Sequence, residues 1–159
     1  MKRKLLLILF FASVMFTGCN QSNTRSYNDT IVDAHKLLFE ATNEFLSGSL
    51  DLIGKPESKK QLLKVIDATR KKLIEAQKPV EDLLPLNDKG LRQKMLEMFS
   101  TALNSMDGLE ANIDILTKKD SEPKAAIMLK GVLSSLLELD ESIKEIQVEY
   151  AESNNAELR

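Results

Sequence analysis

The chain has 159 residues, enough for one domain and too few for two domains of ordinary size. Hydrophobic residues make up 43% of the sequence and charged residues 29%, which is typical of a folded domain and argues against disorder. Aromatic residues reach only 5%, with 6 glycines and 4 prolines, so the composition disfavours a β-sandwich and favours helices. A formal net charge of −2 gives no general attraction to nucleic acid, and we expect no nucleic-acid binding.

The first 18 residues have the pattern of a cleaved secretory signal peptide. Basic residues at positions 2–4 precede an uncharged apolar run over residues 5–16, which is too short to span a bilayer. The run ends in Phe16-Thr17-Gly18-Cys19, which resembles the lipobox of bacterial lipoproteins, although Phe16 stands where leucine is commoner. This resemblance implies cleavage before Cys19 and acylation of that residue. Because Cys19 is the only cysteine, no disulfide within the chain competes with this role.

Cleavage would remove three basic residues and leave 19 against 24 acidic ones, a formal charge of −5. Residues 19–26 are polar and lack apolar periodicity, so they are predicted to form a flexible tether behind the lipid. Two or three acyl chains would anchor the protein to the membrane without spanning it. Asn20 is not the aspartate that, in lipoproteins of this type, favours the inner membrane. The expected location is therefore the cell envelope, at the periplasmic or surface face of the outer membrane.

Four stretches of the remaining chain place apolar residues at steps of three and four, the period of an amphipathic helix. The third stretch is the clearest, and its apolar residues are Leu91, Met95, Phe99, Leu103, Met106, Leu109, Ile113 and Leu116. Turn-forming residues at 54–56, 85–87 and 118–120 separate the stretches. The predicted helices span residues 27–53, 57–84, 88–117 and 121–150.

Helices of similar length joined by short turns run antiparallel to their neighbours. The sequence therefore predicts an all-α fold, an up-down-up-down four-helix bundle over residues 27–150, with a flexible tail at 151–159. A longer three-helix arrangement, or a helical hairpin that dimerises, would satisfy the same pattern. Pro79 interrupts the second apolar stretch and predicts a kink or short break there. The residues expected to cap helix starts are Ser26 with Asp29, Asn87 or Asp88, and Asp120 or Ser121.

The sequence contains no motif for catalysis: it lacks a Gly-x-Ser-x-Gly turn, a phosphate-binding glycine loop and a Glu-x-x-His pair. We expect no enzyme, no cofactor and no metal site. His35, the only histidine, lies beside the first apolar stripe, so an alternative function is a bundle that binds a small ligand, a metal or haem. The simpler interpretation is a half-buried histidine and methionines that fill the core. The methionines in question are Met95, Met98, Met106 and Met128.

Charge is unevenly distributed between the second and fourth predicted helices, of which the second is basic and the fourth acidic. In the predicted topology these helices lie diagonally, which would make one flank basic and the opposite flank acidic. Such flanks indicate docking of an acidic partner or self-association of opposite flanks, whereas the alternative is an ordinary solubilising surface. More lysines gather at the turn expected farthest from the membrane. The candidate interaction residues are Lys59, Lys60, Arg70, Lys71, Lys72, Lys118 and Lys119.

The mature domain opens with Tyr27-Asn28-Asp29-Thr30-Ile31-Val32, which is similar to the start of an uncharacterised family of helical bacterial surface lipoproteins. The resemblance implies a location and a fold, but no activity and no binding residues. Together with the charged flanks, it predicts a membrane-anchored envelope lipoprotein that works as a non-enzymatic binding module. The predicted partners are the membrane, through the lipid on Cys19, and a protein of the cell envelope.

Overall fold

The structure is a computed structural model that describes the backbone of residues 2–84 and 87–153, and side chains from residue 25 onward. Within these ranges all secondary structure is helical and no strand is present, which confirms the predicted all-α class. The long helices are α1 (Lys2–Ser49), α2 (Lys59–Glu81), α3 (Leu91–Ala111) and α5 (Glu122–Ser153). The shorter elements are α4 (Ile113–Leu116) and two 3-10 turns, η1 (Leu50–Leu52) and η2 (Pro56–Ser58).

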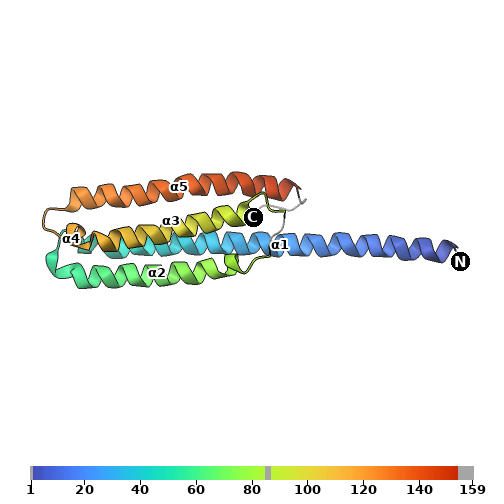
Figure 1. The fold of residues 1–159 in the computed structure, drawn as a ribbon, viewed down its shortest axis with the longest axis horizontal. Helices are drawn as coiled ribbons and strands as arrows, with labels where there is room; N and C mark the ends of the chain where they lie inside the picture. The colour runs from blue at the N-terminus through green and yellow to red at the C-terminus, as the bar shows by residue number, and fades with distance from the viewer. Residues whose placement is uncertain (1, 85–86, 154–159) are drawn as a thin grey trace.

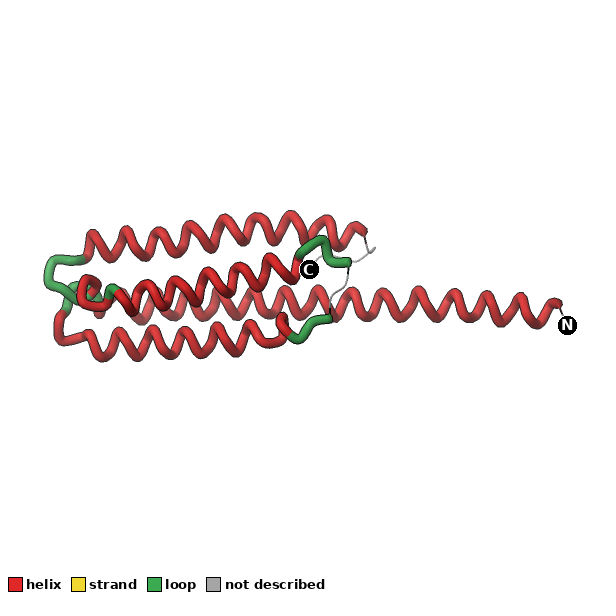
Figure 2. The backbone as a smooth tube through the Cα atoms, in the orientation of Figure 1, coloured by secondary structure: helices red, strands yellow, loops and turns green. Residues whose placement is uncertain are grey.

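The four long helices lie alongside one another, with α1 and α3 between α2 and α5 (Figure 1). The backbone of α3 packs closely against both α2 and α5, and α1 packs closely against α2. The N-terminal part of α1 extends beyond the other helices, whereas the α1–α2 and α4–α5 connections lie together at the opposite end (Figure 2). We call this opposite end the tip. The arrangement places α2 and α5 on opposite flanks of the molecule.

The core consists of the apolar stripes that the helical period predicts. Leu38 of α1, Leu73 of α2 and Phe99 of α3 are all completely buried, and each lies near the middle of its stripe. In α5 the buried stripe begins at Ala125, whereas the next residue, Ala126, is exposed. Removing these stripes from water supplies the main favourable free energy of folding. The described apolar side chains thus form one continuous core between the helices.

The start of the first helix differs from the prediction. α1 is continuous through residues 19–26, where the sequence predicts a tether, and it passes Ser26 and Asp29, so the expected cap does not begin a helix there. Inside the helix, the Thr30 hydroxyl donates to the Ser26 carbonyl at 3.0 Å. No proline occurs between Cys19 and Ser49, so the backbone chemistry of this stretch permits a helix. The side chain of Cys19 lies outside the described part.

The end of α2 and the start of α3 agree with the prediction more closely. α2 ends at Glu81 rather than residue 84, and Pro79 lies in its last turn. The N-cap of α3 is Gly90 and not Asn87 or Asp88 as predicted, but the Asp88 carboxylate still accepts hydrogen bonds from the Arg92 and Gly90 amides, both at 2.9 Å. The predicted turn at 85–87 falls partly on residues outside the described ranges.

Two turns are joined at the tip. The Leu116 carbonyl accepts hydrogen bonds from the Gly54 amide at 2.9 Å and from the Ser121 hydroxyl at 3.0 Å. Ser121 stands at the start of α5, where its carbonyl accepts a hydrogen bond from the Ala125 amide at 3.0 Å while its hydroxyl donates to the turn. Gly54 has a φ of 76°, a left-handed conformation that favours glycine at this position. At the other end of the last helix, α5 continues to Ser153, three residues past its predicted end at residue 150.

Candidate functional site: the lysine row of α2

His35 is part of a polar contact between α1 and α5. Its Nε2 atom lies 2.6 Å from Oδ1 of Asp140, and the Lys144 ammonium donates to Oδ2 of the same carboxylate at 2.6 Å. The side chain of Asp140 is 9% exposed, whereas that of His35 is 25% exposed. Burial alone would raise the pKa of Asp140, but the hydrogen bonds from Lys144 and His35 outweigh burial and lower it. The carboxylate is thus held in its charged form between two helices.

One ring nitrogen of His35 contacts the Asp140 carboxylate, an arrangement that a core histidine and a metal-ligating histidine share. Met95, Met98 and Met106 are buried in the core, and Met128 packs against it. Among the side chains that the structure describes, no group of three or more histidine, cysteine, aspartate or glutamate residues is placed to hold a metal ion. The packing of the methionines and the contact of His35 with Asp140 agree with the simpler interpretation of these residues.

A second polar contact joins the middle of α1 to α5 and to the residues just before α3. Asn28 accepts a hydrogen bond from the Gln147 amide at 2.9 Å, and the rings of Tyr27 and Tyr150 lie 5.7 Å apart. The Tyr27 hydroxyl donates to the Asp88 carboxylate. Burial and this hydrogen bond raise the pKa of Tyr27. Burial would also raise the pKa of Asp88, but the Tyr27 hydroxyl and backbone amides outweigh it and lower that pKa.

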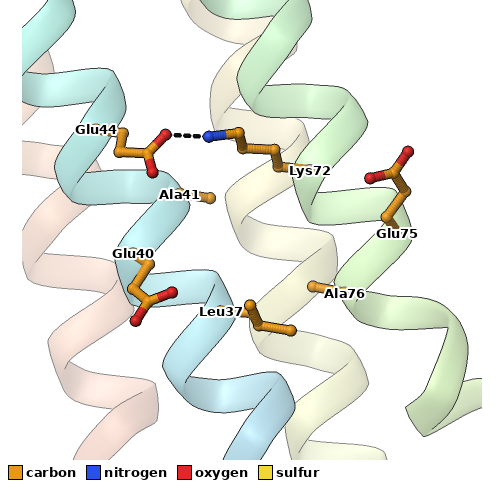
Figure 3. Close-up of a pocket in the computed structure, with 7 residues that line it drawn as sticks. All are labelled: Leu37, Glu40, Ala41, Glu44, Lys72, Glu75 and Ala76. Carbon is orange, nitrogen blue, oxygen red and sulfur yellow. Dashed lines mark hydrogen bonds and ion pairs between the residues drawn. The ribbon is translucent and has the colours of Figure 1, made fainter.

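A groove of about 260 Å³ runs between α1 and α2 (Figure 3). Small and apolar residues form part of its lining, and Figure 3 shows the Lys72 ammonium crossing the groove to the Glu44 carboxylate. Pockets that hold small molecules usually measure about 300–1,000 Å³ and bury most of the ligand. This groove is smaller, and an internal ion pair crosses it, so we do not assign it a ligand. Its lining residues are Leu37, Glu40, Ala41, Glu44, Lys72, Glu75 and Ala76.

Three of the basic candidate residues form ion pairs with carboxylates of neighbouring helices. Arg70 donates to Asp67 at 2.6 Å within α2 and reaches Asp107 at 3.0 Å and Glu110 on α3. Lys59 pairs with Asp114 of α4, and Lys72 pairs with Glu44 of α1. Hydrogen bonds from Arg70 to the α3 carboxylates raise the pKa of its guanidinium. These residues serve the fold, and they are poor candidates for a docking surface.

The other lysines of α2 form a single row on its outer face. Lys60 and Lys71 were predicted, and Lys64 and Lys78 complete the set; all four are exposed and make no ion pair among the described residues. At 100° per residue they lie within about 40° of one another around the helix axis. With a rise of 1.5 Å per residue, the row extends for about 27 Å along α2. We refer to Lys60, Lys64, Lys71 and Lys78 as the lysine row.

The outer face of α5 carries the opposite charge. Five exposed glutamates follow one another at steps of three or four residues, and none makes an ion pair among the side chains described here. They are Glu138, Glu141, Glu145, Glu149 and Glu152, which we refer to as the glutamate row. Because α2 and α5 lie on opposite flanks, the molecule presents a positive and a negative face.

The lysines at the tip are also exposed. Lys118 and Lys119 lie in the turn between α4 and α5, and neither makes an ion pair with a described residue. They follow the C-terminal end of α4, where positive charge complements the unpaired carbonyl groups of a helix. Their position is accounted for by the turn, so the tip is a weaker candidate than the lysine row.

None of the helices in the described part is long and apolar enough to cross a membrane. No family model, no characterised protein and no solved structure matches the chain at a significant level.

Proposed function

We propose that the chain is a lipid-anchored, non-enzymatic interaction module of the bacterial cell envelope, built as an up-down-up-down four-helix bundle. In this proposal the lysine row of α2 is the contact surface, and the partner is an acidic protein. The observation that carries the proposal is the row itself: four exposed lysines share one helix face and have no ion-pair partner within the described chain. The lipobox around Cys19 supplies the proposed anchor.

Electrostatics favour an elongated acidic partner for this surface. A line of positive charges about 27 Å long raises the rate of encounter with a negative surface and sets its orientation, more than it adds affinity. The row runs along the bundle and not across one end, so a protein surface lying alongside α2 can meet all four lysines. Exposed charges are screened by salt, and binding should therefore weaken as ionic strength rises.

The anchor is tested by replacing the proposed acylation site. Cys19→Ala is expected to move the protein from the detergent phase to the aqueous phase in a detergent-partitioning experiment, and to abolish labelling by radioactive fatty acid. Acyl chains contribute about 0.8 kcal/mol for each buried CH₂ group, so their loss leaves no comparable hold on the membrane. Ser22→Ala, a change beside the site, should partition as wild type. Detergent-phase partitioning of the Cys19→Ala protein would refute the lipid anchor.

The contact surface is tested by photo-crosslinking in intact cells. A photoreactive amino acid at position 71, inside the lysine row, is expected to give a defined adduct. The same probe at position 119, an exposed residue of the turn at the tip, serves as the control. Adding Lys64→Glu and Lys78→Glu should remove the adduct formed at position 71, because attraction to an acidic surface becomes repulsion. An adduct that survives both charge reversals would show that the lysine row is not the contact surface.

A further inference from the structure

We propose that the acidic surface that meets the lysine row is the glutamate row of a second copy of this chain. The inference deepens the proposed function by naming its partner, and it rests on the lysine row being a contact surface. The two rows carry opposite charge, lie on different helices and are both left without ion pairs by the described fold.

The spacing of the two rows is matched. Lys64, Lys71 and Lys78 are seven residues apart, and so are Glu138, Glu145 and Glu152. Seven residues make nearly two helical turns, about 10.5 Å along the axis. Two helices laid side by side can therefore form three ion pairs at once, one at each repeat. These six residues form the contact that we propose.

Helix geometry allows the rows to stay in contact over this length. A seven-residue repeat lags an ideal α-helix by about 20° per repeat, so each row drifts slowly around its helix. Helices that cross at about 20° follow that drift, as in most helical bundles. The α2 helix of one copy and the α5 helix of the next would then pack as neighbouring bundle helices do.

Charge repulsion is stronger within the glutamate row than within the lysine row. The five glutamates succeed one another at three or four residues, and like charges at these spacings destabilise a helix. On α2 the exposed carboxylates of Asp67 and Glu75 lie three or four residues from Lys64, Lys71 and Lys78 and offset the repulsion there. Pairing with the lysine row of another copy therefore relieves repulsion mainly on α5.

The positions of the rows determine the kind of assembly. Because α2 and α5 lie on opposite flanks (Figure 1), one copy uses its lysine row toward one neighbour and its glutamate row toward another. Such a head-to-tail contact is not closed by two-fold symmetry and extends into an open row of molecules. Exposed ion pairs are individually weak, so assembly depends on a high concentration of the protein.

The experiment measures self-association of the full chain in a nonionic detergent by sedimentation equilibrium. At about 0.01 M salt the apparent mass should rise with protein concentration, and at about 1 M salt the association should weaken about tenfold or more. Two charge-reversed proteins are then compared. The first carries Lys64→Glu, Lys71→Glu and Lys78→Glu, and the second carries Glu138→Lys, Glu145→Lys and Glu152→Lys.

Each charge-reversed protein alone should remain monomeric, because both of its rows then carry the same sign. An equimolar mixture should associate again, since each row meets its opposite on the other protein. A matched control with Lys118→Glu, Lys119→Glu and Lys124→Glu changes the charge equally at the tip and should associate as wild type. Circular dichroism establishes that every variant keeps its helices.

Three outcomes would overturn the inference: a wild-type chain that stays monomeric at all concentrations, association unaffected by either set of reversals, or a mixture that fails to associate. Crosslinking at position 71 separates this result from the proposed function. An adduct with the mass of two chains supports the second copy. An adduct of another mass that the lysine reversals remove sustains the proposed contact surface and refutes self-association.

Discussion

Phe99→Ala is expected to lower the free energy of unfolding by about 3–5 kcal/mol, the largest effect of any single change considered for this protein. Phe99 is completely buried in α3, the helix that packs against α1, α2 and α5. Truncation removes the apolar area of the ring and leaves a cavity that the surrounding helices can fill only partly. Domains of this size are stable by about 5–15 kcal/mol, so the variant loses a large share of its stability.

Urea unfolding followed by circular dichroism measures this loss, with Ile127→Ala as the matched control. Ile127 is also a large apolar residue, but it is 73% exposed on α5. Its truncation should change stability by no more than about 0.5 kcal/mol. If the two variants unfold at the same urea concentration, Phe99 is not buried in the core and the position assigned to α3 is refuted.

The second large effect is expected from removing both partners of Asp140. Combining His35→Ala with Lys144→Ala leaves a buried carboxylate without its two hydrogen-bond donors. Breaking a buried ion pair in this way costs more than its formation contributed, because the remaining charge stays desolvated. We expect a loss of about 2–3 kcal/mol at neutral pH, reduced from a fully buried case because the side chain of Lys144 is 65% exposed.

The pH dependence of unfolding distinguishes this mechanism from a simple loss of packing. In the wild type the pKa of Asp140 is lower in the folded state than in the unfolded state. The unfolded chain therefore binds more protons near pH 4 than the folded chain does. The stabilisation contributed by Asp140 is present above about pH 4 and is lost as the pH falls through the pKa of Asp140 in the folded state. In the double variant burial alone acts on Asp140 and raises its pKa, so the contribution reverses: stability falls as the pH rises above about 4.

Urea unfolding at several pH values between about 2 and 7 tests the reversal. Asp140→Asn serves as the control, because it removes the titrating group and should flatten this part of the profile. The loss of stability at low pH that remains in Asp140→Asn is assigned to Asp88, whose pKa is also lowered in the folded state. A double variant whose stability still rises with pH as in the wild type would contradict the proposed role of the Asp140 contacts.

The sequence predicts the helical core well because one physical rule controls it. A residue in a helix returns to the same face every three or four positions, so Leu62, Ile66, Leu73 and Val80 had to be buried together, as they are. Helix ends follow weaker rules. Ser26 with Asp29 has the composition of a cap, but the same residues are tolerated inside a helix, and α1 continues through them. Gly90 takes the N-cap position of α3 in place of Asp88, although the Asp88 carboxylate still accepts a hydrogen bond from the Arg92 amide.

The candidate site is predictable only in part from the sequence. Counting charges identifies α2 as basic, but it cannot show that Arg70 contacts α3 or that Lys72 contacts α1, because those partners come from other helices. Lys64 and Lys78 were left out of the candidate set, although their seven-residue distance from Lys71 is visible in the sequence. Spacing along one face is the signal that separates the lysine row from lysines that hold the fold together.

The polar contact between α1 and α5 also bears on the order in which the molecule assembles. His35 and Asp140 are separated by 105 positions in the chain, and Asn28 and Gln147 by 119. Contacts this distant close the longest loops and require the last helix to leave the ribosome before they can form. Until α5 is synthesised, the amide of Asn28 and the imidazole of His35 on α1 are exposed to water. An unfinished chain therefore exposes less apolar surface at this position than it would if the contact with α5 were wholly apolar.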